Sequence, residues 1–397
     1  MKQTRYFFLL AIIFLNSCRI QSSEKESNHI ITGAEQTENY IPLLKNKKIA
    51  VVANHTTIIG NTHLVDSLLS LGINVVKIFS PEHGFRGTVE AGEHVKNYKD
   101  EKTGLPVISL YGSSKKPNLE DLDGLDIIVF DLQDVGVRYY TYISTMHYVM
   151  EACAEKGVEL LILDRPNPNG FYVDGPILDT TYQSFVGMHP VPIVHGMTIA
   201  EFAQMINGEG WLKDGMKCTL NYIACKNYTH DSLYQLPVNP SPNLQNMLSV
   251  YLYSSLGFFE GTSLSVGRGT DFPFQVFGGP DMKNVEFTFT PRSIDGVSKY
   301  PKHENEKCYG VDLRNINIKE LVLQKKINLE WLLFGYQNVN NQDDFFNTFF
   351  YNIAGNKTLK DQIIQGKTAG EIRASWQSDL DDFKLTRKKY LIYEDFE

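Results

Sequence analysis

The sequence predicts an α/β fold, with a Rossmann-like parallel-sheet N-terminal domain and a smaller α+β C-terminal domain. Three observations predict it. Short, continuously apolar segments alternate with helical patterns over the first half of the chain, which is typical of parallel strands covered by helices on both faces. The second half loses this alternation and mixes short strands with helices. The length of 397 residues suits two or three domains.

The first domain is predicted as a succession of strands and helices. Continuous apolar runs predict the strands, and apolar residues at helical spacing predict the helices. In chain order the strands are expected at 48–53, 73–79, 106–111, 126–131 and 158–164, and the helices at 62–71, 119–122 and 139–156. Gly72 and Gly157 mark the ends of two helices. No GxGxxG motif follows a strand, so we infer no dinucleotide site and predict no cofactor.

Two capping boxes organise the second half. Thr198 with Glu201 opens a helix to Asn207, and Thr368 with Glu371 opens a helical region over 369–390. Strands are expected near 217–224 and 273–277, and helices near 244–256 and 316–335. We place the Rossmann-like domain at 41–200 and the C-terminal α+β domain at 201–397.

The N-terminus has the pattern of an export signal. Lys2 and Arg5 precede the apolar run 7–15, which is too short to span a bilayer as a helix. Small residues before Cys18 resemble a bacterial lipobox, with cleavage before the cysteine and lipid on its thiol; an ordinary secretory signal with an incidental cysteine is the alternative. We expect a lipoprotein signal peptide at 1–18 and a flexible polar tether at 19–40. The protein is then a membrane-anchored lipoprotein of the cell envelope, on its periplasmic or surface side.

The amino-acid composition limits the classes of molecule that the protein is expected to bind. The net charge of −8, from 38 Lys+Arg against 46 Asp+Glu, argues against a nucleic-acid partner. Aromatic residues make up 12% of the chain, which suits stacking on sugars, although aromatics also fill cores. Beyond Cys18 there are four cysteines and no CxxC motif, so we expect buried free thiols at Cys153, Cys218, Cys225 and Cys308.

Polar loops follow four of the predicted strands, at 54–56, 80–94, 131–140 and 164–170. In open α/β sheets ligands bind outside the carboxyl ends of the strands, so these loops are expected to line one crevice. The densest of them contains Glu82, His83, Arg86, Glu90, Glu93 and His94. Mutual repulsion among its carboxylates should raise at least one pKa, which lets a carboxylic acid donate a proton at neutral pH. A solvated acidic loop paired with Arg86 and nearby lysines is the alternative.

Other loops add candidate carboxylates for catalysis and candidate arginines for binding a substrate carboxylate. Asp134 is a possible second carboxylate across the crevice, and Arg138 a possible two-pronged partner of a substrate carboxylate, unless the two pair internally. The Asp164-Arg165-Pro166 segment is interpreted as structural. In the second domain, glycines around Arg268 suggest a backbone that surrounds an anionic ligand, with ordinary turn chemistry as the alternative. Glu260 is another possible acid or base.

Several motifs are specific when taken together. They are Asn54–Thr56, Pro81–Gly87 with Ala91–Glu93, Asp131–Arg138, Asp164–Pro168, Glu260–Thr262 with Gly267–Thr270, and Ala374–Gln377. In these motifs the chain resembles the NamZ/YbbC family of bacterial exo-acting β-N-acetylmuramidases, over about residues 41–393.

The resemblance implies a glycoside hydrolase with its active site between two domains. The implied reaction removes N-acetylmuramic acid from the non-reducing end of peptidoglycan fragments. Glu82, in the family's Glu-His motif with His83, is then the first choice for catalytic acid/base, and Glu93, Asp134 or Glu260 is the second carboxylate. Muramic acid carries a lactyl carboxylate, for which Arg86, Arg138 and Arg268 are the candidate partners. The remaining substrate-binding candidates are Asn54, Gln133, Tyr140, Asn243 and Thr270.

Two other functions remain open. The tether and the aromatic content also suit a non-catalytic glycan-binding surface lipoprotein. Histidines in predicted loops beside carboxylates would suit a metal-dependent hydrolase of peptidoglycan amide bonds; they are His55, His83, His94, His189 and His195. Their spacing matches no HExxH or comparable ligand pattern, so no metal site is predicted. The absence of a GxSxG elbow argues against a serine mechanism on an α/β-hydrolase fold.

Overall fold

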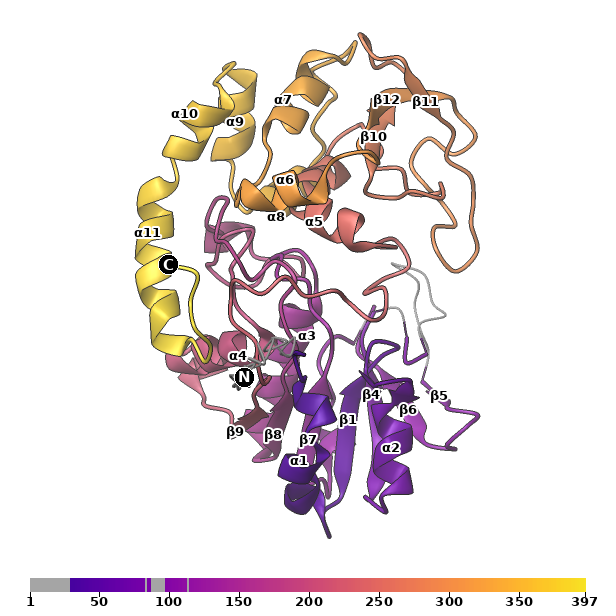
Figure 1. The fold of residues 1–397 in the computed structure, drawn as a ribbon, viewed down its shortest axis with the longest axis vertical. Coiled ribbons are helices and arrows are strands. Elements are labelled where there is room, and N and C mark those ends of the chain that lie inside the picture. Colours follow the sequence, from indigo (N-terminus) through magenta and orange to yellow (C-terminus); the bar gives the residue numbers. More distant parts are fainter. Residues whose placement is uncertain (1–28, 83, 87–96, 113) are drawn as a thin grey trace, which may run out of the picture.

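The structure is a computed structural model that describes residues 29–82, 84–86, 97–112 and 114–397. The predicted signal peptide with Cys18 lies outside the described residues. Figure 1 shows an N-terminal α/β part, coloured indigo to magenta, below a C-terminal part coloured orange to yellow. In the described part of the chain, no helix is long and apolar enough to cross a membrane.

A seven-stranded sheet forms the centre of the N-terminal part. Its strands in spatial order are β5 (Tyr98–Lys99), β6 (Pro106–Ser109), β4 (Val75–Ser80), β1 (Ile49–Ala53), β7 (Ile127–Asp131), β8 (Glu159–Leu163) and β9 (Leu220–Ile223). All neighbouring pairs are parallel except β5 with β6. This confirms the predicted Rossmann-like sheet. Every residue of β1 and β7 is buried, which explains why these strands are apolar up to Asp131, the last residue of β7.

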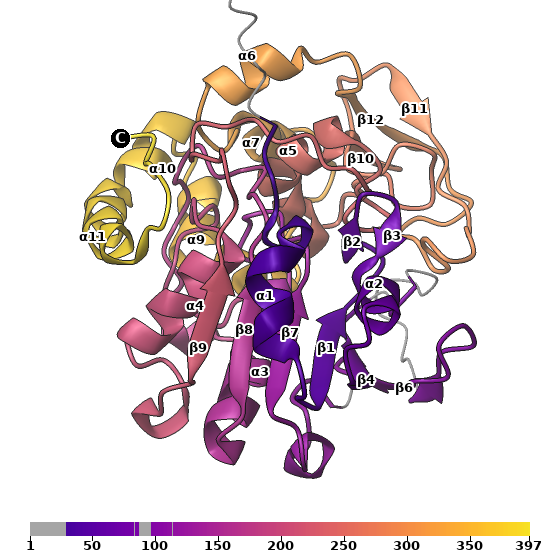
Figure 2. The same cartoon turned by 60° about the horizontal axis from the view of Figure 1, so that its bottom comes forward.

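Helices cover both faces of this sheet, as Figure 2 shows with α1 in front and α3 behind. One core joins Val51 and Val129 to α1 (Thr37–Leu44) and α2 (Leu64–Ser70). The other joins Val52 and Phe130 to α3 (Tyr142–Lys156) and α4 (Ile199–Gly208). Because successive strand residues point to opposite faces, each buried strand supplies both cores. The α3 helix ends at Gly157 with φ 71°, as its sequence predicts.

The C-terminal part combines a small sheet with short helices. The sheet is antiparallel, in the order β10 (Val276–Gly279), β12 (Cys308–Asp312) and β11 (Phe287–Phe289). The helices are α5 (Met247–Leu256), α6 (Ile318–Leu323), α7 (Glu330–Gln337), α8 (Phe349–Ala354), α9 (Thr358–Ile364), α10 (Ala369–Ala374) and α11 (Gln377–Arg387). The helix expected over 316–335 is therefore two helices, because Lys325 between them has a positive φ of 45°. The four cysteines Cys153, Cys218, Cys225 and Cys308 are free and buried, as predicted.

The structure corrects two predicted boundaries. β9 pairs in parallel with β8, and α4 covers the same face as α3, so residues 201–223 belong to the N-terminal part and not to the second domain. Part of the predicted tether is folded as well. Ala34 and Tyr40 are fully buried, and a side chain at Gly33 would meet the Ile223 carbonyl oxygen at 2.4 Å. Residues 31–40 therefore pack against the sheet, and the expectation of a flexible tether is wrong for them.

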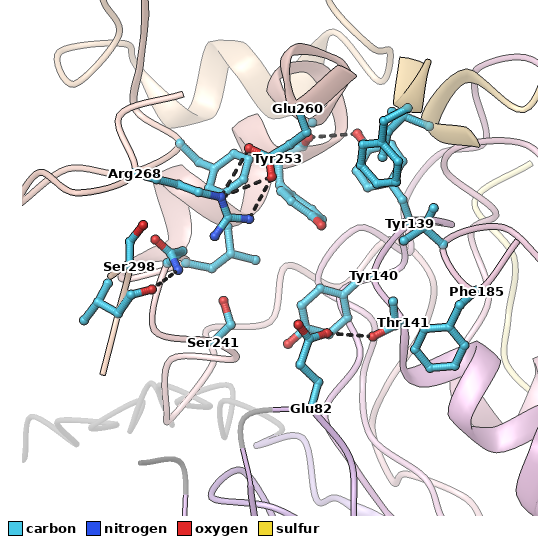
Figure 3. A pocket seen from close by; sticks show the side chains of 18 of the residues that line it. Glu82, Tyr139, Tyr140, Thr141, Phe185, Ser241, Tyr253, Glu260, Arg268 and Ser298 are labelled. Carbon is cyan, nitrogen blue, oxygen red and sulfur yellow. Dashed lines mark hydrogen bonds and ion pairs between the residues drawn. The ribbon is translucent and has the colours of Figure 1, made fainter. Parts of the chain in front are cut away.

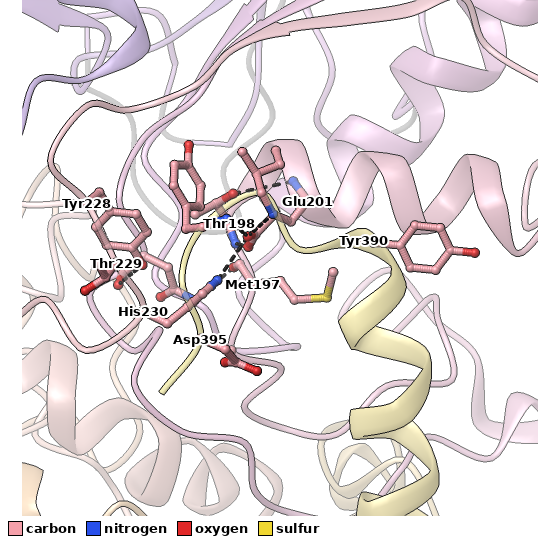
Figure 4. A network of polar contacts seen from close by, with 12 residues as sticks. Met197, Thr198, Glu201, Tyr228, Thr229, His230, Tyr390 and Asp395 are labelled. Atoms are coloured by element: carbon pink, nitrogen blue, oxygen red, sulfur yellow. Dashed lines mark hydrogen bonds and ion pairs between the residues drawn. The ribbon is translucent and has the colours of Figure 1, made fainter. Parts of the chain in front are cut away.

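The C-terminal tail returns to the N-terminal part (Figure 4). Glu201 is fully buried, and its Oε2 accepts from the Thr198 backbone N–H in the predicted capping box. Its Oε1 contacts His230 Nε2 at 3.0 Å and accepts from the Ile392 backbone N–H at 2.9 Å. The Tyr393 hydroxyl donates to Asp164 at 2.6 Å. One carboxylate thus caps α4 and also holds the tail that follows α11.

Candidate active site

A cavity of about 440 Å³ lies between the two parts of the chain, and Figure 3 shows most of the side chains that line it. The N-terminal part lines it with residues 82, 111, 139–141 and 185–186. The C-terminal part lines it with residues 241, 243–244, 253, 257, 260, 268, 274, 297–300, 349 and 353. Of the four loops expected in one crevice, those after β4 and β7 reach the cavity. In the loops after β1 and β8, no described residue lines it.

Glu82 is the carboxylate on the N-terminal wall. It is the second residue after β4, at the carboxyl end of a parallel strand, where ligands bind in such sheets. Its Oε2 accepts a hydrogen bond from the Thr141 hydroxyl at 3.2 Å. Thr141 is the N-cap residue of α3. The positive end of a helix therefore lies beside the carboxylate.

Glu260 and Arg268 form an ion pair on the opposite wall. The Arg268 Nε lies 3.2 and 3.1 Å from the two Glu260 oxygens, and Nη2 lies 3.1 Å from Oε2. The side chains are 28% and 26% exposed, so the pair faces the cavity. Gly267 and Gly269 flank the arginine with φ of 78° and 79°, a backbone conformation that favours glycine. The positive φ of both glycines fits ordinary turn chemistry, which was the alternative to a backbone that surrounds an anionic ligand.

Lys302 adds a second cation behind this pair. Its Nζ donates to the carbonyl oxygens of Phe259, Thr262 and Leu264, at 3.3, 2.5 and 2.9 Å. These bonds fix the turn that carries Glu260. Burial lowers the pKa of Lys302, and the nearby Glu260 carboxylate opposes that shift. This wall therefore holds two cationic side chains around one carboxylate.

Tyrosine rings form the floor of the cavity. The Tyr140 hydroxyl donates to the Pro240 carbonyl at 2.7 Å, and the Tyr139 hydroxyl donates to the Tyr253 carbonyl at 2.9 Å. The Tyr253 ring meets those of Tyr139 and Tyr140 edge to face, with centroids 5.1 and 6.1 Å apart. Burial raises the pKa of both Tyr139 and Tyr140. The hydroxyls are thus neutral and engaged by the protein.

Asn243 also lines the cavity and supplies a hydrogen-bond acceptor that is not used within the protein's described residues. Its Nδ2 donates to the Val297 carbonyl at 2.9 Å. A carbonyl oxygen only accepts, so this bond orients the amide. The Oδ1 atom is buried and has no hydrogen-bond partner among the described residues. A hydroxyl or amide N–H of a ligand would satisfy it.

Asp134 lies outside the cavity lining. It is 6% exposed, and its Oδ2 accepts from the Gly136 backbone N–H at 2.6 Å. Burial raises its pKa to about 7. The Asp134 carboxyl is therefore a raised-pKa group outside the cavity, and its shift comes from burial. Within the loop 80–94, His83 and Glu93 lie outside the described residues.

Arg138 does not reach the cavity, which corrects its predicted role. The side chain is fully buried, and Nη1 donates to the carbonyls of Pro176 and Val191 at 2.8 and 2.7 Å. Nη2 donates to those of Ile353 and Ala354 at 3.1 and 2.7 Å. The guanidinium therefore joins two loops to the end of α8, and it is not placed to bind a substrate carboxylate.

Four other candidates also support loops instead of lining the cavity. Arg86 pairs with Asp100 at 2.9 Å and with Asp66 at 3.5 Å. The Asn54 amide donates to the Tyr142 hydroxyl at 2.7 Å. Gln133 Nε2 donates to the carbonyls of Asp134 and Pro166, and Thr270 Oγ1 donates to that of Gly267. Of the predicted site residues, Glu82, Tyr140, Asn243, Glu260 and Arg268 line the cavity.

Comparison with known proteins also divides the chain into two regions, with the boundary near residue 250. The family model described as "Exo-beta-N-acetylmuramidase NamZ, N-terminal" matches residues 49–248, and its C-terminal counterpart matches residues 251–393. The chain belongs to the NamZ family. The resemblance read from the motifs is thereby confirmed. Glu82 and Tyr140 lie in the first NamZ region and Glu260 and Arg268 in the second, so the cavity lies where the two regions meet.

Individual proteins are similar to this NamZ chain over nearly its whole length. It is 36% identical to the peptidoglycan β-N-acetylmuramidase NamZ of Bacillus subtilis strain 168, over 99% of this chain and 100% of the relative. A crystal structure of a DUF1343 family protein from Bacteroides fragilis is 51% identical, with a TM-score of 0.86, and covers 92% of this chain and 99% of its own. The crystal structure of a second B. fragilis protein of that family is 28% identical, with a TM-score of 0.75. It covers 92% of this chain and 100% of its own.

Proposed function

We propose that this chain is an exo-acting glycoside hydrolase that releases N-acetylmuramic acid from the non-reducing end of peptidoglycan fragments. One observation carries the proposal. A cavity between the two NamZ regions presents Glu82 on one wall and Glu260 with Arg268 on the other. The activity named for the B. subtilis relative, which matches this chain end to end, supports it.

The chemistry of the cavity fits glycosidic cleavage. Such cleavage needs two carboxyl groups around an oxocarbenium-like transition state. We assign Glu82 as the acid that protonates the leaving glycosidic oxygen. Glu260 is the other carboxylate in the described lining, and its negative charge would stabilise the positive charge that develops on the sugar. Asp134 is buried away from the lining, and Glu93 remains a candidate that the described residues do not test.

Arg268 is our candidate for recognising muramic acid. It binds Glu260 through Nε and Nη2, which leaves the donors of Nη1 for a lactyl carboxylate. Lys302 lies behind the pair, so the wall carries more positive than negative groups. Arg86 and Arg138 are engaged elsewhere. A charged hydrogen bond of about 1.5–3 kcal/mol would favour muramic acid over glucosamine by about 10- to 100-fold.

Mass spectrometry of the products tests the function and this selectivity. Residues 19–397 should release free N-acetylmuramic acid from a muramic-acid-terminated disaccharide. Arg268→Met should reduce the preference for that substrate over a glucosamine-terminated one by about 10- to 100-fold. Arg314→Met, which removes an exposed arginine paired with Asp312, is the control and should keep the preference.

Two results would contradict the function. Saturable binding of the disaccharide without any product would favour the glycan-binding lipoprotein. Cleavage of stem-peptide amides that a chelator abolishes would favour the metal-dependent hydrolase.

We also propose that Cys18 carries a lipid that holds the enzyme at the cell envelope. The apolar run 7–15, followed by Asn-Ser-Cys, motivates this proposal. Cys18→Ala should move the protein from the membrane fraction to the soluble fraction. A wild-type protein that is itself found in the soluble fraction would contradict the anchor.

A further inference from the structure

The cavity changes from a buried floor to an open mouth. Tyr139 and Tyr140 on its floor are 4% and 7% exposed. Tyr300 also lines the cavity, yet it is 84% exposed. An isolated exposed aromatic residue needs no explanation on a protein surface. This residue, however, lies at the rim of a cavity that is already lined by aromatic rings.

Tyr300 lies on a loop that is held in place from two sides. We call residues 291–303 the mouth loop. The Asn243 amide holds the Val297 carbonyl, and Ile294 and Ser298 exchange two backbone hydrogen bonds of 2.9 Å. The Arg292 backbone N–H donates to the Gly269 carbonyl at 2.8 Å, which ties the loop to the turn that carries Arg268.

The far end of the mouth loop is bound to the turn that carries Glu260. Lys302 donates to three carbonyls of that turn, and His303 Nε2 lies 2.7 Å from the Ser263 carbonyl oxygen. Backbone and side-chain bonds therefore fix the loop before and after Tyr300. The exposure of Tyr300 is thus a property of an ordered segment that is joined to both turns of the Glu260–Arg268 wall.

An ordered, exposed aromatic ring is suited to stacking on a flat apolar surface. Sugar rings present C–H groups on one face, and burying that face against an aromatic ring removes apolar area from water. In an exo-acting enzyme the terminal sugar occupies the closed end of the cavity, so the next sugar of the chain lies toward the mouth. Tyr300 is a lining residue at that mouth.

We propose that Tyr300 is the stacking platform of a leaving-group subsite. The ligand is the sugar ring that is glycosidically linked to the muramic acid being released. This inference rests on the proposed function, because it names the second half of the same substrate. It predicts that Tyr300 contributes to cleavage of glycans and contributes nothing when the leaving group is a single atom.

Two substrates that carry the same muramic acid distinguish a sugar leaving group from a single-atom leaving group. One is the muramic-acid-terminated disaccharide, and the other is N-acetylmuramyl fluoride, whose leaving group cannot stack. Tyr300→Ala should lower kcat/KM on the disaccharide by about 3- to 10-fold, as expected for one stacking contact, and leave kcat/KM on the fluoride unchanged. Tyr300→Phe should retain the wild-type rates on both, since the ring is kept.

A matched control is Tyr222→Ala. Tyr222 is a 38% exposed tyrosine on β9, the edge strand of the N-terminal sheet, and its removal should change neither rate. An equal loss on both substrates, or no loss on either, would overturn the subsite. A wild-type enzyme that cleaves neither substrate would instead overturn the proposed function, and the subsite with it.

Discussion

Replacing Glu82 by glutamine should lower the release of N-acetylmuramic acid from the disaccharide by at least about 100-fold. The amide keeps the shape of the side chain and can still pair with the Thr141 hydroxyl, but it cannot donate a proton to the glycosidic oxygen. A substrate whose leaving group needs no proton should be much less affected. The same variant should therefore retain most of its rate on N-acetylmuramyl fluoride.

Product mass spectrometry and initial rates on the two substrates measure this effect. Glu101→Gln is the control, because Glu101 is an exposed carboxylate in the turn between β5 and β6, and it should behave as wild type. Equal release by Glu82→Gln and wild type would contradict the assignment. The acid would then be Glu260, Glu93 or Asp134. A loss of similar size on both substrates would make Glu82 a nucleophile or an electrostatic stabiliser instead.

Removing Asp131 should destabilise the protein by about 3–5 kcal/mol. Asp131 ends β7, and its two oxygens accept from Arg165 Nε and Nη2 at 2.5 and 2.9 Å. The side chains are 0% and 2% exposed, so Asp131→Ala would leave the Arg165 charge buried without its counter-ion. Urea unfolding of Asp131→Ala against wild type measures the change in the free energy of unfolding.

Two further variants test whether the loss of stability comes from an unpaired buried charge. Asp271→Ala removes one partner of an exposed pair with Arg292 and should cost no more than about 1 kcal/mol. Replacing both buried partners, as Asp131→Leu with Arg165→Met, should recover much of the stability, because no isolated charge then stays buried. A cost below about 1 kcal/mol for Asp131→Ala would show that the pair does not hold the end of the sheet.

Local patterns explain most of the fold that was predicted. The strands β1 and β7 are buried on both faces, so they are apolar apart from Asp131 at the end of β7, and this pattern predicts parallel pairing. The capping boxes of α4 and α10 satisfy their own helix ends and needed no distant partner. By contrast, β9 is an edge strand with only intermediate or exposed residues, so its membership of the sheet is not visible in its composition.

The site was predictable only where its residues carry a local sequence signal. Polar residues after strands and between glycines marked Glu82, Glu260 and Arg268, and these meet in the cavity. The contributions of Tyr253 and of the mouth loop were missed, because an aromatic residue in a helix or a polar loop carries no signal of what it faces. Arg138 was misplaced because an arginine that binds a ligand and one that binds buried carbonyls look alike in a sequence.

The alternation of strands and helices, the helix caps, the NamZ family motifs and the carboxylate after β4 can all be recognised in the amino-acid sequence. These features depend on neighbouring residues, so the chain records them directly. Which charges face the cavity and which are buried, in contrast, can be seen only in the folded chain. That choice depends on carbonyls and carboxylates supplied by distant segments, such as Ile353 for Arg138 and Asp131 for Arg165. The desolvation cost of a buried charge is offset only where the fold brings such partners together.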